Sequence, residues 1–316
     1  MIRVPPKGFR SCNYIARGTG DTEMATGKER MGGLDFAKMR VAFQGEPGAF
    51  SEAAAVQLLG EGIVTVPRPT FDATFQAIVE GKADALLVPV ENTLAGSVVR
   101  VYDLLLESKL EICGETILPI AHVLIGFPDA TLPDIRSVAS HPMALAQCEQ
   151  FFLKHPEVKR VPAEDTAGSV REMMSRRDKS YAAIASARAA KHYDAVVLQE
   201  NIQDNKENFT RFVLLLPRLE AQRYRPGNAR KMSLAMRLAH RPGALLASLE
   251  PFAKHGLNLL KIESRPIHGK PFEYQFYVDV DAAEIAQLEK ALEEVRTATS
   301  ELCVLGLYAA ARRQAC

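Results

Sequence analysis

The chain has 316 residues, of which 47% are hydrophobic and 24% are charged, and its formal net charge at pH 7 is +1. This length predicts two domains, since a typical domain has roughly 100–200 residues. The small net charge argues against a nucleic-acid-binding protein, and no apolar run approaches the roughly 20 residues of a membrane helix, so neither partner is expected.

Five cysteines are scattered along the chain without CxxC spacing: Cys12, Cys113, Cys148, Cys303 and Cys316. An odd number without a pattern predicts reduced thiols in a cytoplasmic protein rather than a disulfide framework or a zinc site. No histidine pair has the spacing of metal ligands, so no metal site is expected.

Residues 1–38 are rich in Gly, Arg, Ser and Thr and have no hydrophobic periodicity, which predicts a disordered extension. Two explanations are open. An organellar transit peptide would be rich in basic residues and poor in acidic ones, and Asp21, Glu23 and Glu29 argue against it. A start codon assigned too early, with Met24, Met31 or Met39 as the true start, explains the segment equally well.

Residues 39–217 alternate between strand and helix patterns. Strands are predicted at 39–44, 62–66, 84–90, 110–127 (broken at Pro119), 137–139, 159–161, 181–185, 195–198 and 209–216. Helices are predicted from an N-cap at Ser51 to Gly60, at 71–80, 98–107, 142–154 and 166–175, and up to Ala190. This alternation predicts an α/β domain with mainly parallel sheets, in which 110–127 crosses between two lobes.

A second domain is expected at residues 231–310, after a polar and basic linker at 218–230. Strands are predicted at 232–238, 259–266, 273–280 and 302–307, with helices at 244–254 and from an N-cap at Asp281 to Val295. The order βαββαβ is that of the ferredoxin-like α+β unit, and the open edges of its sheet invite pairing with a second copy.

A Thr-Arg-Phe triplet, Thr210, Arg211 and Phe212, opens the strand at 209–216. Alternation places Thr210 and Phe212 on one face of this strand and Arg211 on the other. An arginine can bind a carboxylate with two hydrogen bonds, and a threonine hydroxyl can donate to a leaving group. In isolation the triplet is also ordinary strand sequence, so its context decides its meaning.

The context is a series of longer motifs: FQGEPGAFSEAAA (43–55), PVENTLAGSVVRVYDLLLES (89–108), GETILPIAHVLIG (114–126), SHPMALAQCEQF (140–151) and IQDNKENFTRFVLL (202–215). In this order they resemble the prephenate dehydratases, and 231–308, with RPGALL and IESRP, resembles the amino-acid-binding ACT domain attached to them. The resemblance implies a two-lobed catalytic domain like that of periplasmic binding proteins. Two positions depart from the pattern: Thr93 stands where Ser is common, and Met143 where Gln is common.

The resemblance implies conversion of prephenate to phenylpyruvate in phenylalanine biosynthesis, with loss of water and carbon dioxide and without a cofactor. The segment FQGEPGAFSE is also close to the arogenate dehydratases, so arogenate is the alternative substrate. Thr210 corresponds to the threonine that donates to the leaving hydroxyl. A threonine hydroxyl is a weak acid, so another group or water would supply the proton. Glu91 is the candidate carboxylate for that proton, and its alternative role is structural, binding amides of the turn.

Arg211 is assigned to the side-chain carboxylate of the substrate. The other candidate substrate-binding residues lie beside it in the triplet or at turns between strands and helices, where helix N-termini favour anions: Phe212, Asn92, Thr93, Gly96, Ser97, Ala49, Phe50, Ser51 and His141. Turn and capping chemistry uses the same groups, so that simpler interpretation stays open for the turn residues.

The ACT-like domain implies control by L-phenylalanine bound at a dimer interface, in a homodimer or homotetramer formed through both domains. The candidate effector-binding residues are Gly243, Ala244, Leu245, Leu246, Asn258 (from a neighbouring subunit), Glu263, Ser264, Arg265 and Pro266. Two non-enzymatic alternatives are a periplasmic solute-binding protein, which predicts a secretion signal that residues 1–38 lack, and an amino-acid sensor.

Overall fold

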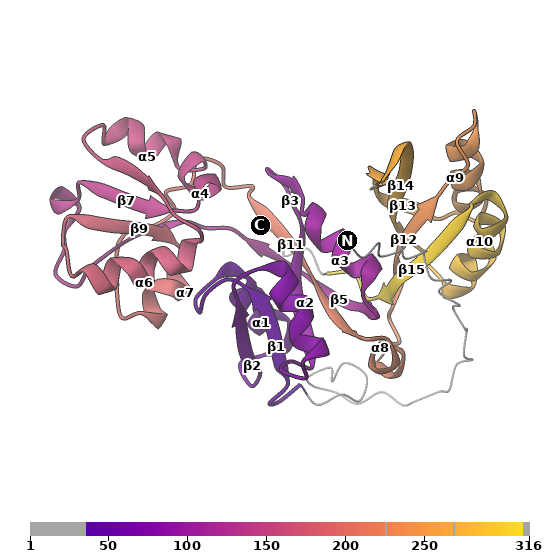
Figure 1. Cartoon of the computed structure of the whole chain (residues 1–316), viewed down its shortest axis with the longest axis horizontal. Helices are drawn as coiled ribbons and strands as arrows, with labels where there is room; N and C mark the ends of the chain where they lie inside the picture. Colours follow the sequence, from indigo (N-terminus) through magenta and orange to yellow (C-terminus); the bar gives the residue numbers. More distant parts are fainter. Residues whose placement is uncertain (1–35, 225, 268, 312–316) are drawn as a thin grey trace, which may run out of the picture. The chain divides into compact units, whose positions relative to one another are not determined.

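A computed structural model describes residues 36–224, 226–267 and 269–311 of the chain (Figure 1). The disorder predicted for residues 1–38 falls almost entirely outside them. The described residues form two compact units. The larger unit contains residues 36–104, 115–215 and 311, and the smaller contains 105–114 and 216–310. Within these ranges, no helix combines the length and apolar character that crossing a membrane requires.

The strands of the larger unit include five that lie in the order β2-β1-β3-β11-β5, although residues 110–114 of β5 and 216–217 of β11 belong to the smaller unit. These strands are β1 (Arg40–Gln44), β2 (Val64–Arg68), β3 (Ala85–Asn92), β11 (Phe209–Pro217) and β5 (Leu110–Pro119), with the short β4 (Gly96–Ser97) paired to β3. The accompanying helices are α1 (Phe50–Leu59), α2 (Phe71–Val79) and α3 (Val99–Glu107). β1 is parallel to β2 and β3, as predicted, whereas β11 runs antiparallel to β3.

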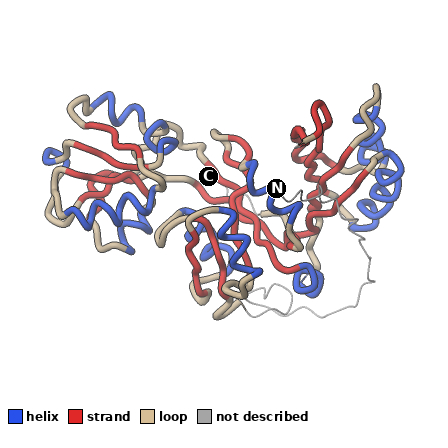
Figure 2. The backbone as a smooth tube through the Cα atoms, in the orientation of Figure 1, coloured by secondary structure: helices blue, strands red, loops and turns tan. Residues whose placement is uncertain are grey.

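A second sheet of the larger unit has the order β10-β6-β9-β7-β8 (Figure 2). Its strands are β6 (Val123–Gly126), β7 (Ser137–Ser140), β8 (Lys159–Pro162), β9 (Tyr181–Ala185) and β10 (Val196–Gln199). Helical segments are η1 (Leu132–Asp134), α4 (Pro142–Ala146), α5 (Glu149–Lys154), α6 (Thr166–Arg176) and α7 (Ala187–His192). β7 is parallel to β8 and β9, but β6 is antiparallel to β9 and β10. The expected two α/β lobes are therefore present, with mixed rather than mainly parallel sheets.

Two helix predictions for this unit were wrong in detail. Helix α1 begins at Phe50 with Ala49 as its N-cap, so Ser51 lies inside the first turn and is not the cap. The carboxylate of Glu52 instead accepts the backbone N–H of Gly48 at 2.7 Å. The single helix expected at 142–154 is divided into α4 and α5, because the backbone at Cys148 leaves the helical conformation.

The two lobes contact each other where α1 begins. The Ser186 hydroxyl, at the N-cap of α7, donates to the carbonyl oxygen of Gly48 at 2.6 Å. A hydrophobic cluster includes Phe43 and Ala49 from one lobe with Ala183 and Ala189 from the other. Two chain segments cross between the lobes, and Ile120 donates to the carbonyl of Asn208 between them at 2.7 Å.

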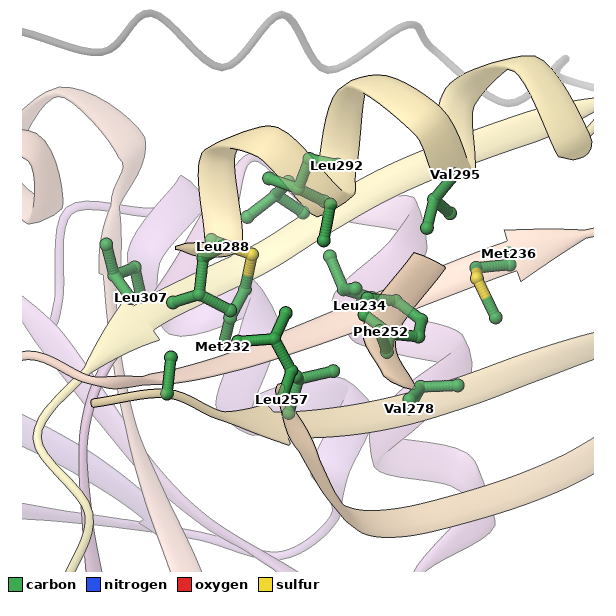
Figure 3. Close-up of a cluster of buried hydrophobic side chains, with 14 of the residues drawn as sticks. Met232, Leu234, Met236, Phe252, Leu257, Val278, Leu288, Leu292, Val295 and Leu307 are labelled. Carbon is green, nitrogen blue, oxygen red and sulfur yellow. The ribbon is translucent and has the colours of Figure 1, made fainter. Parts of the chain in front are cut away.

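The smaller unit confirms the βαββαβ order. This order is formed by β12 (Lys231–Arg237), α9 (Ala244–Lys254), β13 (Asn258–Ile267), β14 (Lys270–Asp281), α10 (Ile285–Ala298) and β15 (Glu301–Tyr308). Its antiparallel strands lie in the order β13-β14-β12-β15. Figure 3 shows Leu288, Leu292 and Val295 of α10 directed at apolar side chains of the strands, which form the core of this unit.

One helix-cap prediction for the C-terminal part was also wrong. Asp281 belongs to strand β14, and the N-cap of α10 is Glu284, which forms a capping box with Gln287. The segment expected to be a linker contains helix α8 (Arg218–Tyr224), whose Ala221 and Tyr224 are buried. Burial of these two side chains stabilises a helix that was not expected from the polar composition of the segment.

We predict that Gly48→Ala destabilises the protein far more than Gly60→Ala. Both glycines have φ near +90°, but an added Cβ at Gly48 would lie 2.5 Å from the Cα of Ala189, whereas nothing lies within 4 Å of one at Gly60. Backbone strain alone should cost about 1 kcal/mol, and the overlap should raise the cost at Gly48 to about 3 kcal/mol or more. Urea-induced unfolding measures both, and equal costs would contradict the close contact between the lobes.

Candidate active site

The side chain of Asn92 joins the end of β3 to the start of β11, where Asn92 pairs with Thr210 in the sheet. Its Nδ2 lies 2.7 Å from Asn208 Oδ1, 3.2 Å from the Phe209 carbonyl and 2.9 Å from Thr210 Oγ1. Its Oδ1 accepts the backbone N–H groups of Leu94 and Ala95. These two amides require the oxygen to face the turn, so the Asn92 amide nitrogen faces Thr210.

The Thr210 hydroxyl is held as an acceptor. Thr210 is 8% exposed, and its Oγ1 receives a hydrogen from Asn92. A hydroxyl has one proton and two lone pairs, so accepting this bond leaves the proton available for donation to another oxygen. This polarity is what a donor to a leaving hydroxyl group requires.

The turn after β3 is tied to the same strand end. The Thr93 hydroxyl donates to the carbonyl of Glu207 at 2.8 Å and accepts the N–H of Phe209 at 3.0 Å. Gly96 and Ser97 form β4 and pair with Asn92 and Glu91. The structure thus brings together Glu91, Asn92, Thr93, Gly96, Ser97, Thr210 and Arg211 among the predicted site residues.

Arg211 is engaged by two carboxylates. Its Nε donates to Glu115 Oε2 at 2.6 Å, and its Nη1 lies 3.8 Å from Glu91 Oε2. The side chains of Arg211 and Glu115 are 12% and 3% exposed, whereas that of Glu91 is 40% exposed. A substrate carboxylate at Arg211 would therefore compete with Glu91. Glu115 was not predicted from the sequence as a partner of Arg211. An acidic residue inside the largely apolar strand β5 could have indicated that it has a charged partner.

A partly buried polar chain extends from Asn92 to His122, and its members Asn208 and His122 are buried. Asn208 Nδ2 donates to Gln147 Oε1 at 3.1 Å, and the same oxygen lies 2.9 Å from Nε2 of His122. His122 is 2% exposed, its ring meets that of Phe50 edge-on at 5.6 Å, and burial lowers its pKa from the ordinary 6.5. Sequence reasoning did not single out Asn208, Gln147 or His122, although each lies within one of the quoted motifs.

Phe50 is thus linked to this group through His122, whereas Ala49 and Ser51 are buried in the first turn of α1. His141 is exposed, and its Nδ1 accepts the N–H of Met143 as the N-cap of α4. Among the described residues, His141 makes no hydrogen bond, ion pair or ring contact with the Thr210 group. The ring of Phe212 is 2% exposed, next to a register shift between Arg211 and Phe212.

Metal-ligating side chains do not gather at this site: the described residues contain no group of three or more His, Cys, Asp or Glu able to hold an ion. The site consists of amide and hydroxyl groups, one guanidinium group and two carboxylates. Such a set can orient an anion and donate a hydrogen bond to a departing oxygen.

Comparison with known proteins decides the family. A family model described as prephenate dehydratase matches residues 41–218, which is more than half of the chain, and one described as ACT domain matches residues 232–297. The chain belongs to the prephenate dehydratase family. This confirms the family resemblance and the predicted fold class, a two-lobed α/β unit followed by a ferredoxin-like unit.

Individual proteins similar to this chain include members of the same family. A chloroplastic arogenate dehydratase/prephenate dehydratase of Arabidopsis thaliana is 40% identical over 290 residues, covering 86% of this chain and 69% of the relative. A prephenate dehydratase of Arthrobacter aurescens, solved in complex with L-Phe, has a TM-score of 0.76 and 31% identity over 88% of this chain and 92% of its own. GqqA, described as a novel type of quorum quenching acylase, has a TM-score of 0.76 and 33% identity over 86% of this chain and 98% of its own.

The ACT unit of this dehydratase family member contains all the candidate effector residues. Gly243 is the N-cap of α9 with a φ of 78°, Ala244 is buried, and Leu245 and Leu246 are exposed. In β13, Asn258, Ser264 and Pro266 are exposed, Arg265 is half-buried, and Glu263 pairs with Lys261 at 3.2 Å. Because β13 runs back along α9, the start of α9 and residues 263–266 lie toward the same end of the unit.

We predict that Asn92→Asp destabilises the protein by about 2–4 kcal/mol near neutral pH, because a carboxylate oxygen would replace the amide that faces three oxygens. Those oxygens would raise the pKa of the introduced group, so the folded state would bind more protons than the unfolded state. Part of the lost free energy of unfolding should therefore return as the pH falls.

Asn201→Asp is the matched control, since Asn201 is exposed and Asp tolerates its φ of 52°. Chemical denaturation measures the free energy of unfolding of both variants between about pH 5 and 8, the range in which most proteins are most stable. A pH-independent loss in the Asn92 variant would mean that its amide does not face these oxygens.

Proposed function

We propose that this chain is a prephenate dehydratase, a carbon–oxygen lyase that converts prephenate to phenylpyruvate. The ring hydroxyl leaves as water, the ring carboxylate leaves as carbon dioxide, and the ring becomes aromatic. The observation that carries the proposal is the Thr210 hydroxyl, which accepts a hydrogen bond from Asn92 and retains its own proton for donation. Family membership supports the reaction class.

In the proposed mechanism, Thr210 donates a hydrogen bond to the departing oxygen. Because a threonine hydroxyl is a weak acid, the proton that completes the water molecule comes from a stronger acid. Glu91 is the proposed source, since it precedes Asn92 and lies opposite Arg211 in the sheet.

Arg211 is the proposed anchor for the side-chain carboxylate of the substrate. Glu115 fixes one edge of the guanidinium through Nε, so the substrate would approach the Nη atoms in place of Glu91. The larger separation of Glu91 from Arg211 and its greater exposure favour this exchange at Glu91 rather than at Glu115.

Arogenate is the second candidate substrate. It carries an ammonium group where prephenate has a keto group, and it would lose water and carbon dioxide in the same way to give phenylalanine. The carboxylates of Glu91 and Glu115 both lie near Arg211, and an ammonium group on the substrate could pair with the more exposed of them, Glu91. The similarity to a plant protein named for both substrates supports testing the two together.

We predict that Thr210→Ala lowers kcat by about 10²- to 10⁴-fold with a small change in KM, because the lost group acts on the leaving oxygen. Thr210→Ser is the control, since it keeps the hydroxyl. Phenylpyruvate formed from prephenate is followed by its enol absorbance in base, and phenylalanine formed from arogenate by amino-acid analysis. A fully active Thr210→Ala protein would remove Thr210 from the mechanism, and lack of turnover by the unaltered protein with both substrates would refute the proposed function.

We further propose that L-phenylalanine regulates the enzyme by feedback at Gly243–Leu246 and Glu263–Pro266 of the ACT unit, with Asn258 from a neighbouring subunit, in a homodimer or homotetramer. The ACT match and the L-Phe complex of the Arthrobacter relative support this proposal. The described cysteines, Cys113, Cys148 and Cys303, are buried and are not in disulfide bonds, which supports the proposed cytoplasmic location.

Gly243→Ala should weaken inhibition by L-phenylalanine about tenfold or more in the concentration required, because a Cβ would obstruct approach of the ligand to the backbone. Gly256→Ala is the matched control: its φ is +68°, Gly243 has +78°, and Gly256 lies beyond the other end of α9. The rate of each variant is measured with and without millimolar L-phenylalanine. A protein that is equally active under both conditions would refute this regulation.

A further inference from the structure

His122 forms one end of the partly buried polar chain, and the direction of each hydrogen bond in that chain is determined. Backbone amides orient Asn92, so its Nδ2 donates to Asn208 Oδ1. Asn208 must then donate through its own Nδ2 to Gln147 Oε1. An amide oxygen only accepts, so the second group facing it, Nε2 of His122, carries the proton.

The surroundings of the His122 ring favour donation of this one hydrogen bond to Gln147. It is neutral at ordinary pH, because burial lowers its pKa. Its Nδ1 has no hydrogen-bond partner among the described residues, so the polar contribution of the ring is its Nε2–H bond to Gln147. The backbone of the same residue is held on both sides, since its N–H donates to Gln203 Oε1 and its carbonyl accepts from Ile202. The ring therefore has a fixed base from which to hold Gln147.

We propose that His122 is a positioning residue for Thr210. It holds the Gln147 amide, Gln147 holds Asn208, and Asn208 holds the Asn92 amide that binds the Thr210 hydroxyl. Loss of the Nε2–H bond leaves Gln147 free to rotate, and the restraint on Asn208 and Asn92 weakens with it. The Thr210 hydroxyl then points at the leaving oxygen for a smaller fraction of the time. This inference rests on the proposed role of Thr210.

His122→Phe keeps a ring in the buried space but removes the Nε2–H donor, and His122→Gln can place an amide N–H near the same point. We expect His122→Phe to lower kcat roughly 10- to 100-fold with little change in KM, since small displacements of a reacting group have effects of this order. His122→Gln should recover a large part of the loss. His155→Phe is the matched control, because that ring also packs against an aromatic side chain, Phe151, at 4.8 Å, and it should retain normal turnover.

The decisive measurement combines substitutions. If His122 acts through Thr210, then His122→Phe should cost little further activity in a Thr210→Ala background. Equal fold-losses in the two backgrounds, or equal kcat for His122→Phe and His122→Gln with both proteins folded, would overturn the proposal. If His122→Phe does not fold, Gln147→Met breaks the same link and is subject to the same test.

Different results would refute the role of Thr210 and the role of His122. Equal rates for the unaltered and Thr210→Ala proteins would refute the role of Thr210, and with it the proposal for His122. A large effect of Thr210→Ala together with an independent effect of His122→Phe would refute only the role of His122.

Discussion

The Asn92 side chain connects two strand ends that are 118 residues apart in the sequence. One amide group binds the turn that follows β3 through its oxygen and the start of β11 through its nitrogen. Glu91 and Thr93 are its neighbours in sequence, and Thr210 and Arg211 lie opposite on the partner strand β11. The placement of all four residues therefore depends on this junction. The same contacts that fix the fold at this point also determine the polarity of the Thr210 hydroxyl.

Electrostatics imposes the second constraint on the site. The pair of Arg211 and Glu115 is almost fully withdrawn from solvent, and burial of two charges is costly unless they are well paired. Glu115 also accepts the backbone N–H of Ala311 through its other oxygen. Glu115 is buried and accepts hydrogen bonds through both oxygens, so it is a poor candidate to leave Arg211. Glu91 is more exposed and lies 3.8 Å from Arg211, so it can exchange with a ligand. The two glutamates therefore have different roles although both face one arginine.

The sequence predicted the elements and their order well, because hydrophobic periodicity reports which faces are buried. It failed where a single residue decided a boundary. Ser51 and Asp281 are favourable N-cap residues, but α1 begins before Ser51, close to the point where Gly48 accepts the Ser186 hydroxyl, and β14 extends through Asp281. The antiparallel direction of β11 also went unpredicted, since it depends on the chain returning from the other lobe.

The site was predictable only in part for a similar reason. Thr210, Arg211 and the turn after β3 have functional residue types at strand ends, where a pattern can be recognised. His122, Gln147 and Asn208 act through bonds to one another, and no spacing in the sequence shows that residues 122, 147 and 208 meet. Their importance follows from burial: a polar side chain withdrawn from water needs a partner, and each partner found leads to the next. Traced in this way from Thr210, the bonds extend to His122 at the crossing between the lobes. The hydroxyl proposed to act on the substrate and the segment that connects the two lobes thus belong to one hydrogen-bonded network.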